Sequence, residues 1–232
     1  MAKLKRFFIT GTDTEVGKTY VTVALLNALR KKGLRTLALK PIAAGCEMLG
    51  DEWVNEDAIQ LRQAMTEHLP YQLLNPIALK SAVAPHLAAE QEGRRLSADR
   101  LAGMVRGALM TAADVALIEG AGGWLVPLNE RETLADLVRM LEVPVILVVG
   151  VRLGCLNHAL LTVQSISSYG LPIAGWVANC VDANAAMIEE NIMTLKARIA
   201  APCLGVIPWQ VPAQAEAAAD FINIDELLNP SA

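Results

Sequence analysis

The sequence has few aromatic residues: only 4% of its 232 residues are Phe, Trp or Tyr, although 53% are apolar. Aliphatic side chains, mainly Ala, Val and Leu, must therefore fill the core. This composition is typical of parallel strands that are buried on both faces and covered by helices. The length matches one large α/β domain, so we expect residues 1–232 to form a single domain with a substantial core.

Long apolar runs are also missing. The longest, residues 143–149, contains Pro144 and is far shorter than the roughly 20 residues that cross a membrane. Lys3, Lys5 and Arg6 resemble the start of a signal peptide, but the apolar stretch behind them is too short and runs directly into a glycine-rich loop. We therefore expect neither a leader nor a membrane-bound protein.

A basic face and a cysteine motif are absent as well. The formal net charge is −4, without a cluster of basic residues, which argues against nucleic-acid binding. The four cysteines show neither a C-x-x-C pair nor the spacing of metal ligands; they are Cys46, Cys155, Cys180 and Cys203. Reduced thiols in a cytoplasmic protein are the simplest interpretation.

The most informative motif is present at residues 10–19, which read Thr-Gly-Thr-Asp-Thr-Glu-Val-Gly-Lys-Thr. An apolar run precedes it and a long amphipathic stretch follows, as in the strand, glycine turn and helix of a phosphate-binding loop. A helix that begins here directs unpaired N–H groups and the positive end of its dipole towards an anion. Lys18 adds a cation for the β- and γ-phosphates, and Thr19 adds a hydroxyl for magnesium. The motif predicts binding of a nucleoside triphosphate.

This loop departs from the common pattern in its spacing. Five residues rather than four separate Gly11 from Gly17, so Thr12 lies where the first glycine usually stands. The alternative interpretation is a glycine turn that only caps a helix. The strand before the motif and the helix after Gly-Lys-Thr favour the phosphate-binding loop.

Short apolar runs alternate with amphipathic stretches along the chain. We expect strands at residues 7–10, 36–40, 115–119, 145–149, 173–178 and 203–207. We expect helices at residues 19–32, 57–65, 97–112, 133–141, 157–169 and 183–199. This alternation predicts an α/β fold of three layers with a mostly parallel central sheet and right-handed crossovers. Ligands of such sheets bind beyond the carboxyl ends of the strands.

Two charged residues end predicted strands. Lys40 alone would suggest a surface lysine with a buried stem, but beside a phosphate-binding loop it can neutralise the γ-phosphate. Glu119 closes a buried strand, where an unpaired carboxylate is costly. Magnesium ligation, directly or through water, is one explanation; a tight turn whose N–H groups satisfy the carboxylate is the other. The glycines after Glu119 allow close backbone approach to a ligand.

Other polar residues give weaker signals. Asp57 begins a helix, which alone favours a capping role over a ligand role. Residues 150–158 form a second glycine loop that enters a helix, and such a helix start can hold a carboxylate. His158 is as consistent with a structural as with a functional role, and Cys155 has no neighbouring base in sequence to activate it. Asn179 ends the fifth strand and offers a donor and an acceptor, which suits a purine edge.

Taken together, these motifs resemble dethiobiotin synthetases. The resemblance rests on residues 10–19, Lys40-Pro41, and residues 119–124, 148–150, 153–158 and 175–179, and extends from about Arg6 to residues 207–209. It implies a P-loop NTPase-like fold and a ligase of biotin synthesis that uses ATP, Mg²⁺ and CO2 to close a cyclic urea on 7,8-diaminopelargonic acid. One amine takes up CO2 as a carbamate, ATP phosphorylates the carbamate, and the second amine expels phosphate.

The resemblance also implies residue roles. Lys18, Lys40 and Thr14 would act at the reacting groups, and Thr19, Asp57 and Glu119 would bind magnesium. The implied nucleotide-binding set is Glu15, Val16, Gly17, Lys18, Thr19, Tyr20, Asp57, Glu119, Gly120, Ala121, Gly122, Asn179, Cys180, Pro208, Trp209 and Gln210. The implied substrate-binding set is Ala44, Gly154, Cys155, Leu156 and Asn157. The last four form a helix start that would serve the partner subunit's site, which implies a homodimer with a shared active site.

Ala44 departs from the family pattern, which commonly has a serine that contacts the diamine at this position. One hydrogen bond contributes about 0.5–1.5 kcal/mol net. The hypothesis is retained activity with a raised KM for the diamine; a paralogue with a shifted substrate is the alternative.

Two other classes share such a fold. Nucleotide-switch ATPases of the partition or septum-positioning type usually carry an additional lysine where this chain has Asp13, and many have a membrane-binding tail. Residues 220–232 are acidic without a basic face, which counts against membrane docking. Amidotransferase ligases of the cobyrinate type add a glutaminase domain, and nothing after Trp209 is long enough for one.

Overall fold

A computed structural model describes residues 4–209 and 215–229 of the chain. One residue of the predicted nucleotide-binding set, Gln210, lies outside these described residues.

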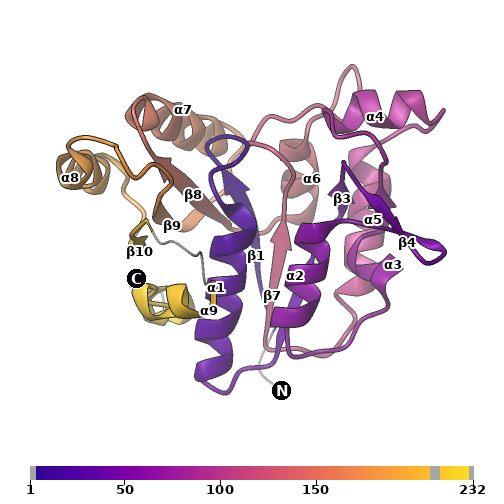
Figure 1. The fold of residues 1–232 in the computed structure, drawn as a ribbon, viewed down its shortest axis with the longest axis horizontal. Helices are drawn as coiled ribbons and strands as arrows, with labels where there is room; N and C mark the ends of the chain where they lie inside the picture. Colours follow the sequence, from indigo (N-terminus) through magenta and orange to yellow (C-terminus); the bar gives the residue numbers. More distant parts are fainter. Residues whose placement is uncertain (1–3, 210–214, 230–232) are drawn as a thin grey trace.

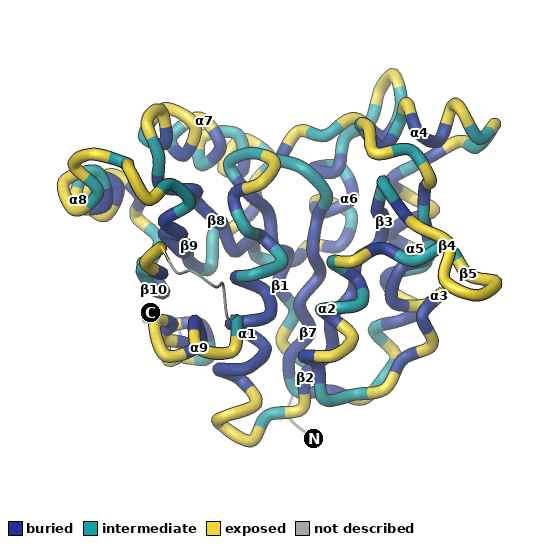
Figure 2. The backbone as a smooth tube through the Cα atoms, in the orientation of Figure 1, coloured by how far each residue is buried: buried dark blue, intermediate teal, exposed yellow. Residues whose placement is uncertain are grey.

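The centre of the molecule is a six-stranded sheet in which every described pairing is parallel (Figure 1). Its strands, in spatial order, are β10 (Cys203–Ile207), β9 (Ile173–Cys180), β8 (Val145–Val151), β1 (Lys5–Gly11), β7 (Val115–Glu119) and β2 (Thr36–Leu39). All six predicted strands are therefore present. β7 and β8 are buried along their whole length, as expected for strands covered on both faces (Figure 2).

Helices connect the strands and cover the sheet. They are α1 (Lys18–Lys31), α2 (Glu56–Ala64), α5 (Ala98–Ala108), α6 (Leu134–Leu141), α7 (Cys155–Ser168) and α8 (Ile188–Arg198). The chain runs from β1 to β2 in one direction along the sheet and from β7 to β8, β9 and β10 in the other. Right-handed crossovers therefore place α1 on one face and α6, α7 and α8 on the opposite face. The predicted three-layer arrangement follows from this topology.

Side chains explain where several helices begin and end. The Asn55 side chain accepts a hydrogen bond from the Ala58 N–H and caps α2. Ser97 caps α5 in the same way, as predicted. Gly33, with a φ of 75°, follows the end of α1 and acts as the predicted stop.

Some boundaries differ from the prediction. The α8 helix begins at Ile188 rather than at 183, because Met187 adopts a left-handed conformation with a φ of 56° just before it. The α5 helix ends at Ala108, four residues before the predicted end. The α7 helix begins at Cys155, two residues earlier than predicted, directly after Gly154, whose φ is 91°.

Several short elements were not predicted, because each is too short to show a periodic pattern. They are β3 (Ile42–Ala43), β4 (Glu47–Leu49), β5 (Glu52–Val54), α3 (Tyr71–Leu74), β6 (Ile77–Ala78), α4 (Pro85–Gln91), α9 (Ala215–Ala218), η1 (Ala219–Phe221) and α10 (Asp225–Leu228). β3 pairs with β6 in parallel, and β4 with β5 as an antiparallel hairpin. Most of them lie between β2 and β7.

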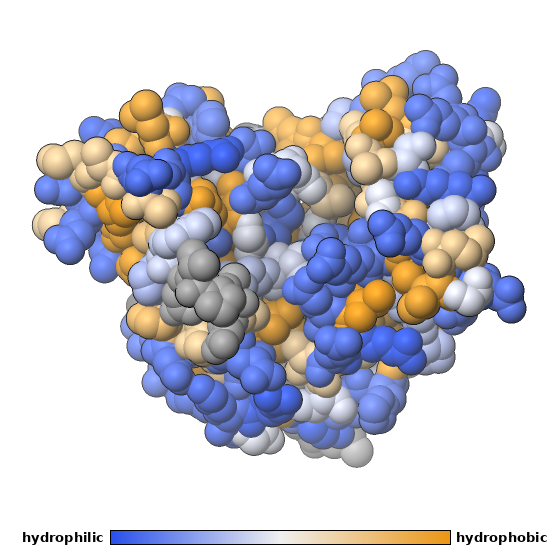
Figure 3. Space-filling model, in the orientation of Figure 1, coloured by the Kyte–Doolittle hydropathy of each residue, from blue (hydrophilic) through white to orange (hydrophobic). Residues whose placement is uncertain are grey.

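The apolar core forms two clusters. The larger surrounds β1, β2 and β7 together with α1, α5 and α6, and the smaller contains Trp176 and Leu147 and extends to Leu195 of α8. None of the described helices combines the length and the apolarity needed to span a membrane. The surface is hollowed between the parts of the chain that carry α7 and α4 (Figure 3).

Candidate active site

The nucleotide loop lies between β1 and α1, against the end of β8. The Thr12 N–H donates to the Val148 carbonyl at 3.0 Å. The Val16 side chain is buried and fills the space above Gly150, where an added Cβ would lie only 2.8 Å from a Val16 methyl carbon. Its side chain thus anchors the loop to the sheet, and the predicted contact of Val16 with nucleotide stays a prediction.

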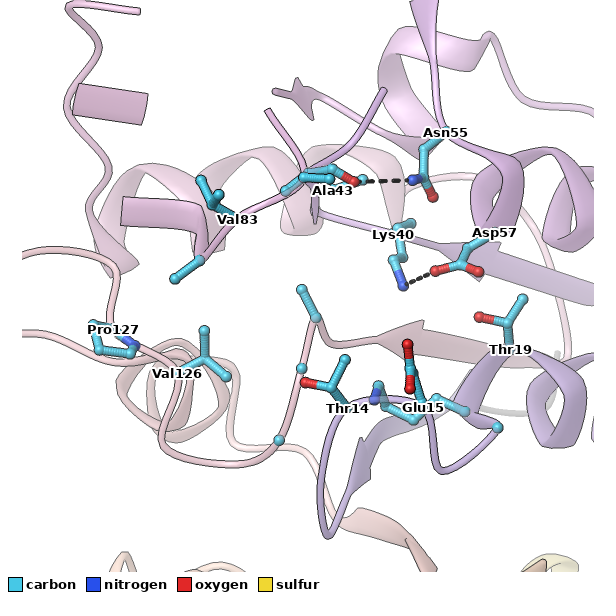
Figure 4. A pocket seen from close by; sticks show the side chains of 18 of the residues that line it. Thr14, Glu15, Thr19, Lys40, Ala43, Asn55, Asp57, Val83, Val126 and Pro127 are labelled. Carbon is cyan, nitrogen blue, oxygen red and sulfur yellow. Dashed lines mark hydrogen bonds and ion pairs between the residues drawn. The ribbon is translucent and has the colours of Figure 1, made fainter. Parts of the chain in front are cut away.

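A cavity of about 800 Å³ opens beside this loop (Figure 4). Most predicted residues of the loop and the strand ends line it: Thr14, Glu15, Gly17, Lys18, Thr19, Tyr20, Lys40, Ala44, Asp57, Ala121 and Gly122. One end is polar, with Lys40, Asp57 and Thr19, and the other is apolar, with Val83, Val126 and Pro127. The cavity therefore suits a ligand that has both a charged and a hydrocarbon part.

Lys40 is the centre of the polar end. Its Nζ donates to Glu119 Oε1 at 2.6 Å, to Asp57 Oδ2 at 2.8 Å and to the Gly120 carbonyl at 3.2 Å. The side chains of Lys40 and Glu119 are 4% and 0% exposed, whereas that of Asp57 is 42% exposed. Thr19 Oγ1 donates to Glu119 Oε1 at 2.7 Å. An ammonium group thus joins two carboxylates, one buried and one facing the cavity.

The sheet register explains why these charges meet. In the pairing of β2 with β7, Leu39 lies beside Ile118, so the next residues, Lys40 and Glu119, emerge together at the carboxyl ends of adjacent strands. The Lys40 carbonyl accepts a 2.6 Å hydrogen bond from the Asn75 side chain, which fixes the Lys40 backbone. Asp57 reaches the same point from the first turn of α2.

The local charges shift several pKa values. Burial lowers the pKa of Lys18 to about 8, and repulsion by Lys40 adds to this effect. Burial also disfavours the ammonium form of Lys40, but the attraction of Glu119 and Asp57 outweighs it and raises the pKa of Lys40. The pKa of Asp57 is lowered, because the nearby Lys40 charge and its hydrogen bond overcome the effect of burial. Lys40 and Asp57 are therefore both charged at neutral pH.

The three predicted metal ligands fit magnesium. Glu119 Oε2 is buried and has no hydrogen-bond partner among the described residues, so this oxygen is available to a cation. Thr19 Oγ1 donates to Glu119 Oε1 and Lys40 Nζ donates to both Glu119 and Asp57, which brings one hydroxyl and two carboxylates together. Within residues 4–209 and 215–229, no group of three or more His, Cys, Asp or Glu side chains forms a metal cluster. A cation bound here would need further oxygen ligands from phosphate and water, which is how Mg²⁺ usually binds.

Known proteins identify the family. A family model described as an AAA domain matches residues 5–217. The ATP-dependent dethiobiotin synthetase of Cellvibrio japonicus is 55% identical over 97% of this chain and 98% of its own length. Those of Marinobacter nauticus and Pseudomonas paraeruginosa are 52% and 51% identical, over 88% and 95% of this chain and 87% and 97% of their own lengths. The chain belongs to the dethiobiotin synthetase family. It is therefore a ligase of that type, and the predicted resemblance is confirmed.

Solved structures confirm the fold class. The septum site-determining protein MinD of Pyrococcus horikoshii, complexed with Mg-ADP, has a TM-score of 0.55 at 20% identity, over 99% of this chain and 90% of its own. The signal recognition particle receptor FtsY of Elizabethkingia anophelis, in complex with GDP, has a TM-score of 0.54 at 14% identity, over 95% of this chain and 64% of its own. At these identities the likeness concerns the P-loop NTPase-like fold alone.

Some residues expected from the family resemblance do not line the cavity. They are Val16, Glu119, Gly120, the α7 start at Gly154, Cys155, Leu156 and Asn157, and Asn179, Cys180, Pro208 and Trp209. The last eight follow β8 or β10 or end β9, on the other side of β1 from the cavity's charged end, so the sheet order separates them from it. Asn179 Nδ2 donates to the Val16 carbonyl at 3.0 Å, which places it against the nucleotide loop.

Other cavity residues were not predicted as site residues. They are Ala43, Asn55, Ala82, Val83, Ala84, Gly123, Leu125, Val126 and Pro127. The sequence could have predicted Asn55 as a helix N-cap, because this residue precedes a helix that begins with two acidic residues. The apolar wall residues had none, since in sequence they look like core residues.

Proposed function

We propose that the chain closes the cyclic urea ring of dethiobiotin from 7,8-diaminopelargonic acid and CO2, with ATP and Mg²⁺, as a cytoplasmic homodimer whose 232 residues form one domain. Relatives that carry the name ATP-dependent dethiobiotin synthetase, at 51–55% identity over most of both chains, support this proposal. The observation that carries it is the convergence of Lys18, Lys40, Asp57 and Thr19 at one end of a cavity whose other end is apolar, with the buried Glu119 bonded to Lys40 and Thr19.

The proposed reaction proceeds in three steps. The first amine adds to CO2 and loses a proton, which gives a carbamate. A carbamate oxygen then forms a bond to the γ-phosphorus while the bond from that phosphorus to ADP breaks. The second amine attacks the carbonyl carbon and loses a proton, and phosphate leaves with the electron pair of the C–O bond. Mg²⁺ would supply charge neutralisation at the transferring phosphoryl group.

The residues of this chain would act mainly by position and charge. Lys18 and Lys40 bring two ammonium groups to the polar end, where a carboxylated amine and a terminal phosphate would meet. Thr14 lies on the cavity wall in the same loop and would contact these reacting groups. Thr19, Asp57 and Glu119 would hold the magnesium ion. Positioning of the reactants and electrostatic stabilisation of the transition state are the main sources of rate enhancement in phosphoryl transfer.

The hydrocarbon part of the diamine would lie against the apolar wall. Val83, Val126 and Pro127 face the interior of the cavity opposite the charged residues (Figure 4). The substrate carboxylate would be bound by the α7 start of a second subunit. Support for this comes from the exposed leucines of that region, since Leu153 is 99% and Leu161 57% exposed and both would be covered in a dimer.

Product formation tests the proposal directly. The full-length protein, incubated with ATP, Mg²⁺, ¹³C-bicarbonate and 7,8-diaminopelargonate, is expected to yield dethiobiotin that carries one ¹³C, with one ADP and one phosphate per product. Mass spectrometry and a coupled ADP assay measure both. ATP hydrolysis that is independent of the diamine, without a labelled product, would support a nucleotide-switch ATPase instead.

Ala44 provides a test of substrate binding. It lines the cavity, and its carbonyl accepts a 3.3 Å hydrogen bond from the Asn55 side chain, which fixes the backbone beside the α2 start. A serine hydroxyl here adds one polar contact for the diamine. We expect Ala44→Ser to lower the KM for the diamine about two- to tenfold and to leave the KM for ATP unchanged, because one hydrogen bond contributes about 0.5–1.5 kcal/mol. Ala82→Ser, at another lining position, is the control, and an unchanged KM in Ala44→Ser refutes the hypothesis.

A further inference from the structure

The nucleotide loop contains a backbone conformation that requires external support. Glu15 has a φ of 59°, in the left-handed region that non-glycine residues rarely adopt, and Gly17 follows with a φ of 81°. Such conformations persist where the surrounding structure holds them in place. The contacts made by the neighbouring residue Asp13 show what holds this loop.

Asp13 connects Thr14 and Lys18 with Arg152 through three hydrogen bonds. Its Oδ1 accepts from the Thr14 N–H at 2.8 Å, and its carbonyl accepts from Lys18 Nζ at 3.1 Å. Its Oδ2 accepts from Arg152 Nη2 at 2.7 Å. The Asp13 carboxylate thus lies between the Thr14 amide and Arg152, and the Asp13 backbone carbonyl contacts Lys18.

Arg152 comes from a distant part of the sequence. It follows β8 and precedes Gly154, the residue before the α7 start. The loop lies along this same strand end, where Thr12 bonds the Val148 carbonyl. The Arg152 and Asp13 side chains are 37% and 46% exposed, and a partly exposed ion pair of this kind contributes little to global stability. Its geometry, rather than its contribution to stability, is what matters for the site.

We propose that Arg152 is a positioning residue: by its ion pair with Asp13 it holds Thr14 and Lys18 in place and joins the nucleotide loop to the α7 start. The proposal rests on the proposed function for its effect on turnover.

Four variants test this role: Arg152→Gln, Arg152→Lys, Asp13→Asn and the double variant Asp13→Asn/Arg152→Gln. We expect Arg152→Gln to lower kcat about tenfold while the KM for ATP changes less than about twofold, because misplaced groups affect the transition state most. Arg152→Lys should restore most of kcat. Asp13→Asn should match Arg152→Gln, and the double variant should be no worse than either, because both changes break one interaction.

A second readout does not depend on turnover. Hydrogen exchange of the peptide that contains the Thr14 amide should be about fivefold faster in Arg152→Gln than in the unchanged protein, because that amide bonds Asp13. Arg139→Gln removes another arginine–aspartate ion pair, with Asp136 on α6, and serves as the control. It should change neither kcat nor exchange in the loop.

The outcomes separate the two proposals. If the unchanged protein forms no dethiobiotin, the proposed function fails, and hydrogen exchange alone decides the role of Arg152. If dethiobiotin is formed, three results each overturn the positioning role. The first is unchanged hydrogen exchange in Arg152→Gln, and the second is a kcat of Arg152→Gln within twofold of that of the unchanged protein. The third is a double variant whose loss of kcat equals the product of the losses in Asp13→Asn and Arg152→Gln. Loss of thermal stability without rescue by Arg152→Lys also overturns it.

Discussion

Replacement of Lys40 by methionine is expected to destabilise the protein and to abolish turnover. Glu119 is fully buried and would lose its principal charge and hydrogen-bond partner, and breaking a buried ion pair typically costs about 3–5 kcal/mol of unfolding free energy. Loss of a buried cation at the proposed reaction centre should also lower kcat by roughly 100- to 1,000-fold or more. Urea unfolding and dethiobiotin formation measure the two effects separately.

Two control variants make this prediction specific. The double variant Lys40→Met/Glu119→Gln removes both charges, so it should recover part of the lost stability but none of the activity. Lys31→Met removes a surface ion pair with Asp220, whose side chains are 56% and 72% exposed, and should cost less than about 1 kcal/mol. If Lys40→Met unfolds at the same urea concentration as the unchanged protein, Lys40 does not compensate a buried charge.

Gly17→Ala is expected to abolish nucleotide binding. Gly17 has a φ of 81°, and an added Cβ would lie 2.3 Å from Asn179 Nδ2, which holds the Val16 carbonyl. Alanine would therefore strain the backbone and displace Asn179 from the loop. We expect the affinity for Mg-ADP, measured by calorimetry, to fall at least about 100-fold, which corresponds to roughly 2.7 kcal/mol.

Gly33→Ala is the matched control for this change. Gly33 has nearly the same φ, 75°, but nothing lies within 4 Å of an added Cβ. It should lose about 1 kcal/mol of stability from backbone strain and keep its nucleotide affinity. Binding by Gly17→Ala within threefold of the unchanged protein would contradict the expected loss of loop geometry.

The frame of the fold could be predicted from the sequence because its elements are locally encoded. β7 and β10 occupy the predicted residues 115–119 and 203–207, since each is a short apolar run. The charged end of the cavity could be predicted too, because parallel strands present their last residues at one edge. Asp57 was more ambiguous, as its position at a helix start suits a cap equally well.

The apolar half of the cavity could not be predicted in this way. Val83, Val126 and Pro127 line it, yet valine and proline in loops carry no pattern that distinguishes a cavity wall from the core. The Asp13–Arg152 pair spans 139 residues and depends on β8 lying beside β1. Only the spatial order of the strands brings these two residues together, and that order cannot be derived from the spacing of residues within a short segment of sequence.

The pairing of β2 with β7 has an evolutionary consequence. Side chains alternate between the two faces of a strand, so one inserted or deleted residue in either partner would turn Lys40 away from Glu119. The hydrophobic layer could repack around such a change while the enzyme lost its chemistry. Length variation among relatives should therefore be tolerated in the solvent-facing β4–β5 hairpin and be selected against in these two short strands.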